Sequence, residues 1–433
     1  MSNKGKDLYD ELKSRVDQLK EENSPEKKYW DVWKLGCVLK ARQHDVRKLY
    51  HDTSREFVER YRDQLIEMKE HVLENIDSYV EQTIRVMRET NNFKVYYAET
   101  NEEAQKFFME EIGDNKIIYK SKSNEAKDIG IIDILKKNDI VIKETDLGDV
   151  LVQLFDYKLP SFQIGPGAHF LIEDIVARIK EVHGVEIKPE PSAIVDYYRR
   201  TYRKELLNDV KISLTSANAI SAEEGTIVLG ENEGNISLLT RATEKHIVVC
   251  GISKIVPTVL DAVLVAKTQT RINNVPFAYI NLISRPSCTS DIRGINVLGM
   301  YGAKEVVVIL VDDWRKGALK ENVIYRDFLR CINCGSCNYI CTASRAFGNI
   351  FASKYGWGPT AIIRDYIHNG LEPAVKDGLF LCSGCENCFH WCPMSINLGE
   401  IMKSIKKEAT KVGLCPPALK EYQKKILNDK NPF

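Results

Sequence analysis

Hydrophobic positions recur every three or four residues through the first part of the chain. Beyond Leu49 the apolar side chains at this spacing are Phe57, Tyr61, Leu65, Met68, Val72 and Ile76. They form one apolar stripe, which predicts an amphipathic helix packed on a neighbouring domain. A long coiled coil is disfavoured because the seven-residue register is not sustained. Glycine is scarce and charges are dense, so we expect helices over 1–90 with a break at Pro25.

From residue 93 the pattern changes to short apolar runs separated by stretches with helical spacing. Strands are predicted at 94–98, 116–120 and 139–143, with helices over 101–112 and 123–137 between them. Further strands are expected at 150–155, 226–230, 246–250, 276–283 and 305–311, and a helix over 190–208. Strands that alternate with helices indicate β-α-β units and a largely parallel sheet. We therefore expect one α/β domain over 91–320.

Polar groups cluster where these strands end, which is where open α/β sheets place their ligand sites. Lys120 and Lys122 follow the second strand, and His169 and Glu224 occur in later turns that contain glycine. Two lysines with backbone amides at a helix start predict binding of a small carboxylate or phosphate. In the structural alternative, Ser123 caps a helix and the lysines face solvent. Neither G-x-G-x-x-G nor a P-loop motif occurs, and no catalytic residue is identified.

Near the C-terminus one cysteine spacing occurs twice. The runs are Cys331-Ile-Asn-Cys334-Gly-Ser-Cys337-Asn-Tyr-Ile-Cys341 and Cys382-Ser-Gly-Cys385-Glu-Asn-Cys388-Phe-His-Trp-Cys392. Each reads C-x2-C-x2-C-x3-C, the spacing of bacterial-type ferredoxins with two [4Fe–4S] clusters. In that spacing three cysteines of a run bind one cubane, and the fourth binds the other cluster.

The predicted ligand sets are therefore crossed between the runs. The first cluster is expected to be bound by Cys331, Cys334, Cys337 and Cys392, and the second by Cys341, Cys382, Cys385 and Cys388. A structural zinc site has no use for the third cysteine, and a disulfide framework is typical of a small secreted chain. Arg330, Arg345 and His390 lie close to these cysteines in sequence. They are expected either to raise a cluster potential or to serve as surface charges.

Composition and charge narrow the function classes. Lys plus Arg and Asp plus Glu each number 61, and the zero net charge argues against non-specific binding to nucleic acid or a membrane surface. No apolar run reaches the ~18 residues of a membrane span, and the start of the chain lacks the apolar region of a signal peptide. Twelve cysteines, eight of them in the two runs, favour a reducing compartment. We expect a cytoplasmic protein with a cluster domain over 321–410 and a docking or partly ordered tail over 411–433.

Taken together, these segments resemble the LUD family, in particular the B-type iron–sulfur proteins of bacterial lactate utilisation. The residues that carry the resemblance include Lys120-Ser-Lys-Ser123, Glu144-Thr-Asp-Leu-Gly148, Glu224-Gly-Thr-Ile-Val228, Asn232-Glu-Gly234, His246-Ile-Val-Val249, Arg285-Pro-Ser287, Asp291-Ile292 and the double cysteine motif. The resemblance implies a LUD-type α/β sheet, similar to that of CoA transferases and sugar isomerases, with N-terminal helices. It further implies a C-terminal α-helical ferredoxin module with two [4Fe–4S] clusters, in a three-protein complex that oxidises L-lactate to pyruvate.

Three departures from the family pattern leave other functions open. Arg285 replaces a glycine, Cys288 stands where arginine is expected, and Thr342 replaces the proline after the last cysteine of the first run. One alternative is an electron-relay subunit of a different dehydrogenase or of a heterodisulfide-reductase-like complex. Another is a small-anion-binding LUD module whose clusters are structural. A free-standing LUD enzyme ranks below both, because neither a flavin fingerprint nor a nucleophile–base pair is found.

Overall fold

The computed structural model of the chain describes residues 4–21, 52–156, 167, 170–271 and 276–429. The chain forms two compact units, which we call the sheet unit (41–158 and 170–334) and the helical unit (1–40, 159–169 and 335–433). The predicted helix break at Pro25 and the candidate ligand residue His169 lie outside the described residues.

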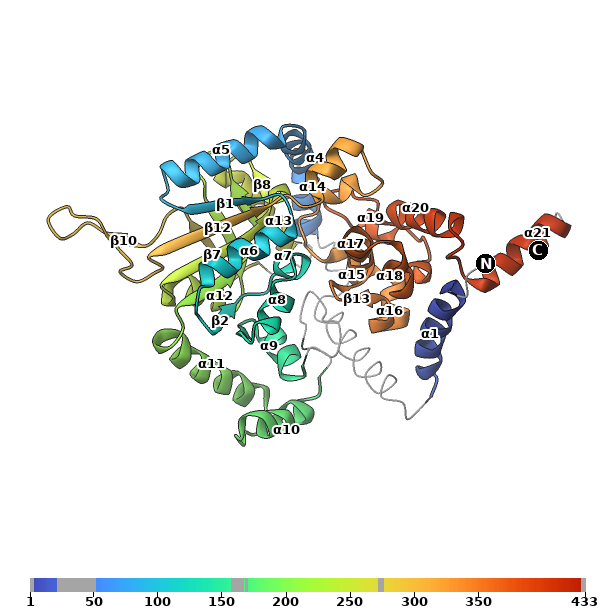
Figure 1. Cartoon of the computed structure of the whole chain (residues 1–433), viewed down its shortest axis with the longest axis horizontal. Helices are drawn as coiled ribbons and strands as arrows, with labels where there is room; N and C mark the ends of the chain where they lie inside the picture. The colour runs from blue at the N-terminus through green and yellow to red at the C-terminus, as the bar shows by residue number, and fades with distance from the viewer. Residues whose placement is uncertain (1–3, 22–51, 157–166, 168–169, 272–275, 430–433) are drawn as a thin grey trace. The chain divides into compact units, whose positions relative to one another are not determined.

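A six-stranded sheet forms the centre of the sheet unit (Figure 1). Its strands follow the order β1-β12-β7-β4-β2-β3, and every neighbouring pair is parallel. In that order the strands span Lys94–Ala98, Glu305–Val311, Lys245–Gly251, Ile212–Thr215, Ile117–Lys120 and Val141–Glu144. The predicted α/β class with a parallel sheet is confirmed, although β4 was not predicted.

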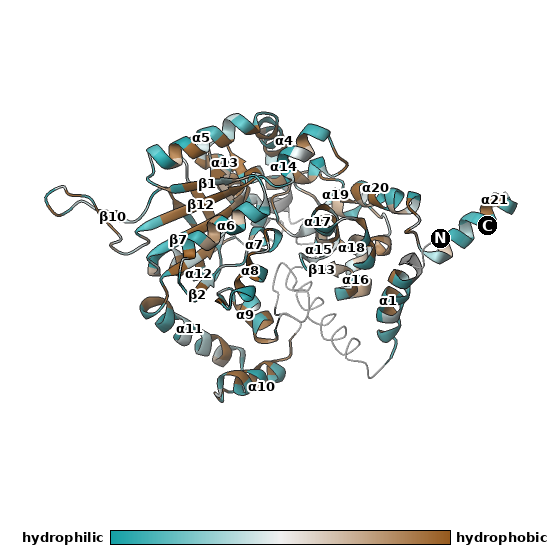
Figure 2. Ribbon diagram, in the orientation of Figure 1, coloured by the Kyte–Doolittle hydropathy of each residue, from teal (hydrophilic) through white to brown (hydrophobic). Residues whose placement is uncertain are grey.

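Alternate residues of the central strand β12 belong to two different hydrophobic cores. Val306 and Val308 pack with one core, whereas Val307 and Ile309 pack with the other. Successive side chains of a strand point to opposite faces, so an unbroken apolar run is expected of a strand that is covered on both sides. Figure 2 shows this hydrophobic stretch in β12 and β7.

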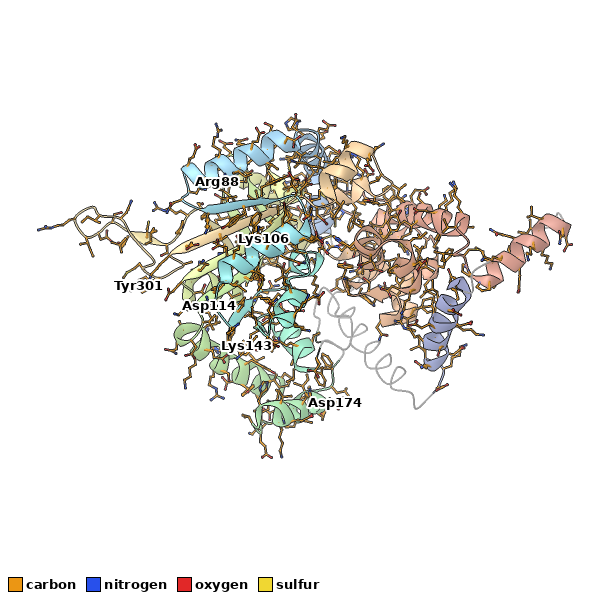
Figure 3. The ribbon with its side chains drawn as sticks, in the orientation of Figure 1. Arg88, Lys106, Asp114, Lys143, Asp174 and Tyr301 are labelled. Atoms are coloured by element: carbon orange, nitrogen blue, oxygen red, sulfur yellow. The ribbon has the colours of Figure 1, made fainter. Side chains whose placement is uncertain are left out.

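Helices cover both faces of this sheet. On one face lie α4 (Asp52–Glu74) and α5 (Ile76–Glu89), and on the other α6 (Asn101–Ile112), α7 (Asn124–Asp128) and α8 (Ile131–Lys137). Leu65, Val72 and Ile76 of the predicted apolar stripe are buried. The other helices of this unit are α9 (Leu147–Leu154), α10 (Ile172–His183), α11 (Pro191–Asn208), α12 (Asn235–Ala242), α13 (Val259–Arg271) and α14 (Arg315–Glu321). Lys143, labelled in Figure 3, ties the edge strand β3 to α11 through an ion pair with Glu205.

Two predicted elements differ in the structure. The segment 150–155 was predicted as a strand, but it lies almost entirely in helix α9. This prediction was wrong because a short helix buried on several sides has the same continuous apolar run as a buried strand. The helix predicted over 123–137 is divided into α7 and α8 at Gly130, whose φ of +78° is left-handed and interrupts the helix.

A second, four-stranded sheet has the order β8-β5-β6-β9. Its strands span Ile255–Val256, Ala219–Ser221, Ile227–Glu231 and Tyr279–Ile283; β9 falls within a predicted strand segment, and β6 overlaps another. A hairpin of β10 (Cys288–Thr289) and β11 (Val297–Leu298) projects from the unit (Figure 1). Tyr301, labelled in Figure 3, follows the hairpin and is 79% exposed.

The helical unit is built from short helices and one small hairpin. Its longer elements are α1 (Lys4–Gln18), α16 (Thr342–Phe347), α17 (Pro359–Asn369), α18 (Leu371–Lys376), α20 (Leu398–Lys411) and α21 (Pro417–Asp429), and its hairpin strands are β13 (Ala352–Ser353) and β14 (Gly356–Trp357). The buried indole of Trp357 donates a hydrogen bond to the carbonyl of Gly348 at 2.7 Å. The tail expected over 411–433 contains α21, which buries no residue. No described helix in either unit is both long and apolar enough to cross a membrane.

Candidate metal centre

The two cysteine runs have the same local backbone. A short 3-10 helix leads into each run: η2 (Arg326–Arg330) precedes Cys331, and η4 (Leu379–Leu381) precedes Cys382. The backbone angles are φ −61° and ψ 122° at Cys331, and φ −61° and ψ 121° at Cys382. A short helix then follows each loop, α15 (Ser336–Ile340) in one run and α19 (Asn387–His390) in the other. The repeat in the sequence is thus also a repeat of conformation.

Left-handed residues shape both loops at matching positions. Asn333 and Gly384, each two residues after a first cysteine, have φ of +57° and +70°. Gly335 and Glu386, each directly after a second cysteine, have φ of +75° and +56°. Such turns direct backbone N–H groups into an anion-binding concavity. In the first loop the N–H of Asn333 donates to Sγ of Cys331 at 3.4 Å, as expected of a loop that holds a thiolate.

The four cysteines of the second predicted set surround one open hollow. Cys341, Cys382, Cys385 and Cys388 all line it, and apolar side chains from α17 and α20 complete its wall. The hollow contains about 350 Å³ of empty space, part of it continuous with bulk solvent. Cys341 comes from the first run and the other three from the second. The structure therefore brings together the residues that crossed ligation requires, while the ligation itself stays a prediction.

Burial and hydrogen bonds give these thiols different acidities. Burial raises the pKa of Cys388 to about 12, with a further contribution from the neighbouring Cys341. Burial also raises the pKa of Cys341. At Cys385 burial acts in the same direction, but the N–H of Asn387 and the hydroxyl of Thr342 contribute to a net lowering of the pKa. Without a cation in the hollow, a thiolate is therefore less favourable at Cys388 than at Cys385.

The residues around the hollow fit an iron–sulfur cluster. Soft thiolate ligands select zinc, copper(I) and iron–sulfur clusters over harder cations. Across the described part of the chain, no group of three or more His, Cys, Asp or Glu side chains converges as a site for one metal ion. The sulfur ligands of a cubane bind different iron atoms, so they line a hollow instead of meeting at one point. Four thiols around one hollow therefore fit an iron–sulfur cluster, in keeping with the cysteine spacing.

Thr342 contributes a polar contact to this hollow. Its hydroxyl lies 3.5 Å from Sγ of Cys385 and 3.2 Å from the hydroxyl of Ser383. Cys341 caps the helix that Thr342 begins, because its Sγ accepts a hydrogen bond from the N–H of Ser344 at 3.4 Å. A proline at position 342 would have no hydroxyl. This departure from the family pattern therefore places an additional hydrogen-bonding group beside a candidate ligand.

The charged residues that lie near the cysteines in sequence are occupied elsewhere or exposed. Arg330 forms ion pairs with Glu70 at 3.2 Å and with Asp327 at 3.0 Å. Arg345 donates to a backbone carbonyl at 2.9 Å, and His390 is exposed. For Arg330 the structure therefore favours a role in ion pairs over a role in setting a cluster potential.

At the carboxyl edge of the parallel sheet, Lys120 and Glu144 end neighbouring strands and form a buried ion pair. Nζ of Lys120 lies 2.8 and 2.6 Å from the two carboxylate oxygens, and the side chains are 1% and 2% exposed. Burial raises the pKa of Glu144, and the attraction of Lys120 opposes this shift. Nζ of Lys122 lies 3.8 Å from the carboxylate of Asp149. Both lysines predicted to bind an anion thus already face carboxylates.

The other residues of the predicted anion site have separate roles in the structure. Ser123 caps α7, because its hydroxyl oxygen accepts from the N–H of Ala126 at 3.0 Å. The carboxylate of Glu224 accepts from the N–H of Val259 at 2.9 Å, at the start of α13. The structure brings Lys120 and Lys122 to one edge of the sheet, and His169 is outside the described residues. Anion binding by Lys120, Lys122, His169 and Glu224 stays a prediction.

Two further lysines near the cysteine loops were missed by the sequence reasoning. Nζ of Lys406 donates to the carbonyl of Cys382 at 2.5 Å, and Lys69 is buried where the charge of Cys331 acts on it. Each lysine is distant in the chain from the cysteine that it approaches, so no local motif signals it.

Comparison with known proteins gives two domain matches and several relatives. Residues 80–311 match the LUD domain, and residues 327–396 match the 4Fe-4S dicluster domain. The chain is 28% identical over 364 residues to the uncharacterized electron transport protein YkgF of Escherichia coli K12. The alignment covers 83% of this chain and 74% of that protein. It is 29% identical over 341 residues to lactate utilization protein B of Bacillus subtilis 168. That alignment covers 78% of this chain and 68% of that protein.

Among solved structures, the crystal structure of a DUF162 family protein from Deinococcus radiodurans matches with a TM-score of 0.28 and 14% sequence identity. The match covers 55% of this chain and 98% of that protein.

Proposed function

Because this chain belongs to the LUD domain family and carries a 4Fe-4S dicluster domain after it, we propose that it is an iron–sulfur electron-transfer subunit with two [4Fe–4S] clusters. The observation that carries the proposal is the hollow in which one cysteine of the first run lies with three of the second. The proposed ligands are Cys331, Cys334, Cys337 and Cys392 for one cluster, and Cys341, Cys382, Cys385 and Cys388 for the other.

The chain's own residues would hold and adjust these clusters. Each cluster, when bound, supplies a centre that takes up and releases one electron. The backbone N–H of Asn333 and the hydroxyl of Thr342 offer hydrogen bonds to ligand sulfurs, which is one way a protein sets a cluster potential. Cys385 is exposed, so an acceptor can approach the second cluster from solvent.

The substrate system that fits best is the oxidation of L-lactate by a complex of several subunits. Support comes from the names of the relatives, lactate utilization protein B and an electron transport protein. Oxidation of a 2-hydroxy acid releases two electrons, and two one-electron centres suit this number. A small carboxylate is the expected ligand of the sheet edge around Lys122. The free cysteines among the described residues suit a reducing, cytoplasmic setting.

The proposed division of labour follows the chain. The N-terminal helices over 1–90 and the tail over 411–433 would contact partner subunits, because neither segment contains a cysteine of the two runs. The LUD α/β domain over 91–320 would face the substrate side, and the module over 321–410 would carry the clusters. In this division α21 suits a docking role, since none of its side chains is buried within this chain.

Metal analysis of anaerobically purified protein tests the proposal. We expect about eight irons and about eight acid-labile sulfides per chain, four of each per cubane. Cys341→Ser is expected to alter the electron paramagnetic resonance (EPR) signal of the cluster held by Cys382, Cys385 and Cys388. Cys288→Ser, outside both runs, is the matched control and is expected to change neither signal. Stoichiometric zinc, or four irons at full occupancy, would contradict the proposal.

A further inference from the structure

Lys69, on α4, is a buried lysine next in sequence to Glu70, whose carboxylate pairs with Arg330, the residue before Cys331, at 3.2 Å. It is 3% exposed, and its ammonium donates to the backbone carbonyl of Ser253. Cys331 and Cys250 are among the groups whose charge acts on it. Within the described residues no carboxylate forms an ion pair with Lys69. A buried ammonium that lacks a carboxylate partner is unfavourable, so this position favours an anionic neighbour of another kind.

The charges around Lys69 do not neutralise it. The carboxylate of Glu70, the next residue, is engaged by two arginines. Lys254, whose charge also acts on Lys69, shares the single carboxylate of Glu125 with Arg315, at 3.2 and 2.9 Å. Positive charge is therefore in excess on this side of Cys331. An iron–sulfur cluster with four thiolate ligands is an anion that would compensate it.

Lys406, on α20, lies beside the second run. Its ammonium donates to the carbonyl of Cys382, the first cysteine of that run, at 2.5 Å. It also lies over the ring of Phe380, 5.8 Å from the ring centre. Lys406 is partly exposed, whereas Lys69 is buried. Lys406 therefore contacts the backbone of the first cysteine of the second run, whereas Lys69 lies on the helix that pairs with the residue before Cys331. The two lysines differ in their access to solvent.

We propose that Lys69 and Lys406 raise the reduction potentials of the first and second clusters, and that buried Lys69 has the larger effect. The inference rests on the proposed presence of the two clusters. Reduction adds one electron to a cluster, and at pH 7, below the pKa of about 8 to which burial lowers Lys69, its ammonium stabilises the reduced form. Water screens the charge of Lys406 more than that of Lys69.

EPR-monitored redox titration of the full, cluster-loaded chain tests this inference. In Lys69→Met we expect the ratio of oxidised to reduced first cluster, at a fixed potential, to rise about tenfold, which corresponds to a fall of about 59 mV for one electron. Lys69→Arg keeps the charge and is expected to keep the potential. In Lys406→Met only the second cluster is expected to shift, and by less. The signal that Cys341→Ser alters identifies the second cluster.

The result that would overturn the inference is a Lys69→Met protein with both potentials unchanged, or with both shifted equally. If that variant does not fold, the salt dependence of the two potentials in the wild-type protein tests the inference instead. A change from low to high salt is expected to change the second potential and to leave the first nearly unchanged, and equal salt dependence would overturn the inference. Absence of two cluster signals from the wild-type protein would instead refute the proposed function.

Discussion

The hydroxyl of Thr342 distinguishes the second cysteine site from the first. It lies 3.5 Å from Sγ of Cys385, whereas the equivalent position after Cys392 is Pro393, which has no side-chain donor. A ligand thiolate has no proton, so the hydroxyl would donate to the sulfur and stabilise the reduced cluster. The family's proline at this position would remove the effect.

We therefore expect Thr342→Val to lower the reduction potential of the second cluster. The free energy of its one-electron reduction should become less favourable by about 1 kcal/mol, the net contribution of one hydrogen bond. Thr342→Ser keeps the hydroxyl and serves as the control. Redox titration of both variants measures the change. An equal potential in the valine and serine proteins would show that the hydroxyl has no electrostatic role.

The acidities of the thiols predict an order of reaction in the cluster-free chain. The thiolate is the reactive form, so a lower pKa gives faster alkylation at a given pH. Cys385 has a lowered pKa and is exposed, whereas burial raises the pKa of Cys388 to about 12. We expect iodoacetamide to modify Cys385 before Cys388. Below pH 12 the rate at Cys388 should rise about tenfold per pH unit, which mass spectrometry of timed samples measures.

At the residue scale, the sequence predicted candidate ligands that follow a fixed local spacing. It did not predict contacts between residues that are distant in the chain. The candidate cluster cysteines were found because a cubane loop needs short, regular intervals. Lys69 was missed because its neighbour Cys331 lies on a segment far along the chain. The partner of Lys120 was missed for a similar reason, since Glu144 faces it only when β2 and β3 pair.

Among the elements, helix α20 connects the stability of the helical unit to the second cysteine loop. Its N-cap Asn397 accepts from the N–H of Glu400 at 3.0 Å, and Gly399 in the same turn lines the hollow together with Cys388. Ile401 and Ile405 bury the inner face of the helix. The cap therefore orders the same turn that reaches the cysteine.

We expect Asn397→Ala to lower the free energy of unfolding by about 1 kcal/mol, because the first turn loses its cap. Asn397→Asp retains an acceptor and is expected to retain most of the stability. Urea unfolding under anaerobic conditions measures both. Loss of iron on incubation should also be faster in the alanine protein than in the aspartate protein. Equal rates would show that the helix cap does not affect metal retention by the cysteine loop.

Elements with a clear period were predicted well, and elements without one were not. The unbroken run Glu-Val-Val-Val-Ile-Leu-Val became β12 because both of its faces are covered. The run 150–155 had a similar apolar content but became a helix, with Asp146 as its cap. Only the capping residue and the packing of α9 distinguish the two cases, and packing is not visible in a local window.

For the whole molecule, we expect the isolated chain with intact clusters to be reduced by dithionite but not to oxidise L-lactate. Iron–sulfur cubanes take up electrons singly, and no group that accepts a hydride was recognised in the sequence. Turnover with an artificial acceptor, measured with and without the co-purified partners, tests this. Steady turnover by the chain alone would instead support the free-standing enzyme.

The overall class could be predicted from the alternation of strands and helices, but the order of strands could not. β1 lies at the edge of the sheet beside β12, not beside β2, which follows it in the chain. The sequence shows which segments are strands, but pairing depends on how the helices pack over both faces.

This strand order also has a consequence for how the protein matures on the ribosome. β1 pairs Lys94 with Val307 in β12, so the sheet stays incomplete until nearly three quarters of the chain has been synthesised. Translation proceeds from the N-terminus at about 5–20 residues per second, so β1 and its helices wait many seconds for their partner. Both cysteine runs follow β12, and they leave the ribosome only after all six strands have been made. The order of synthesis therefore allows the sheet to close before the cysteines that are proposed to bind the clusters have been made.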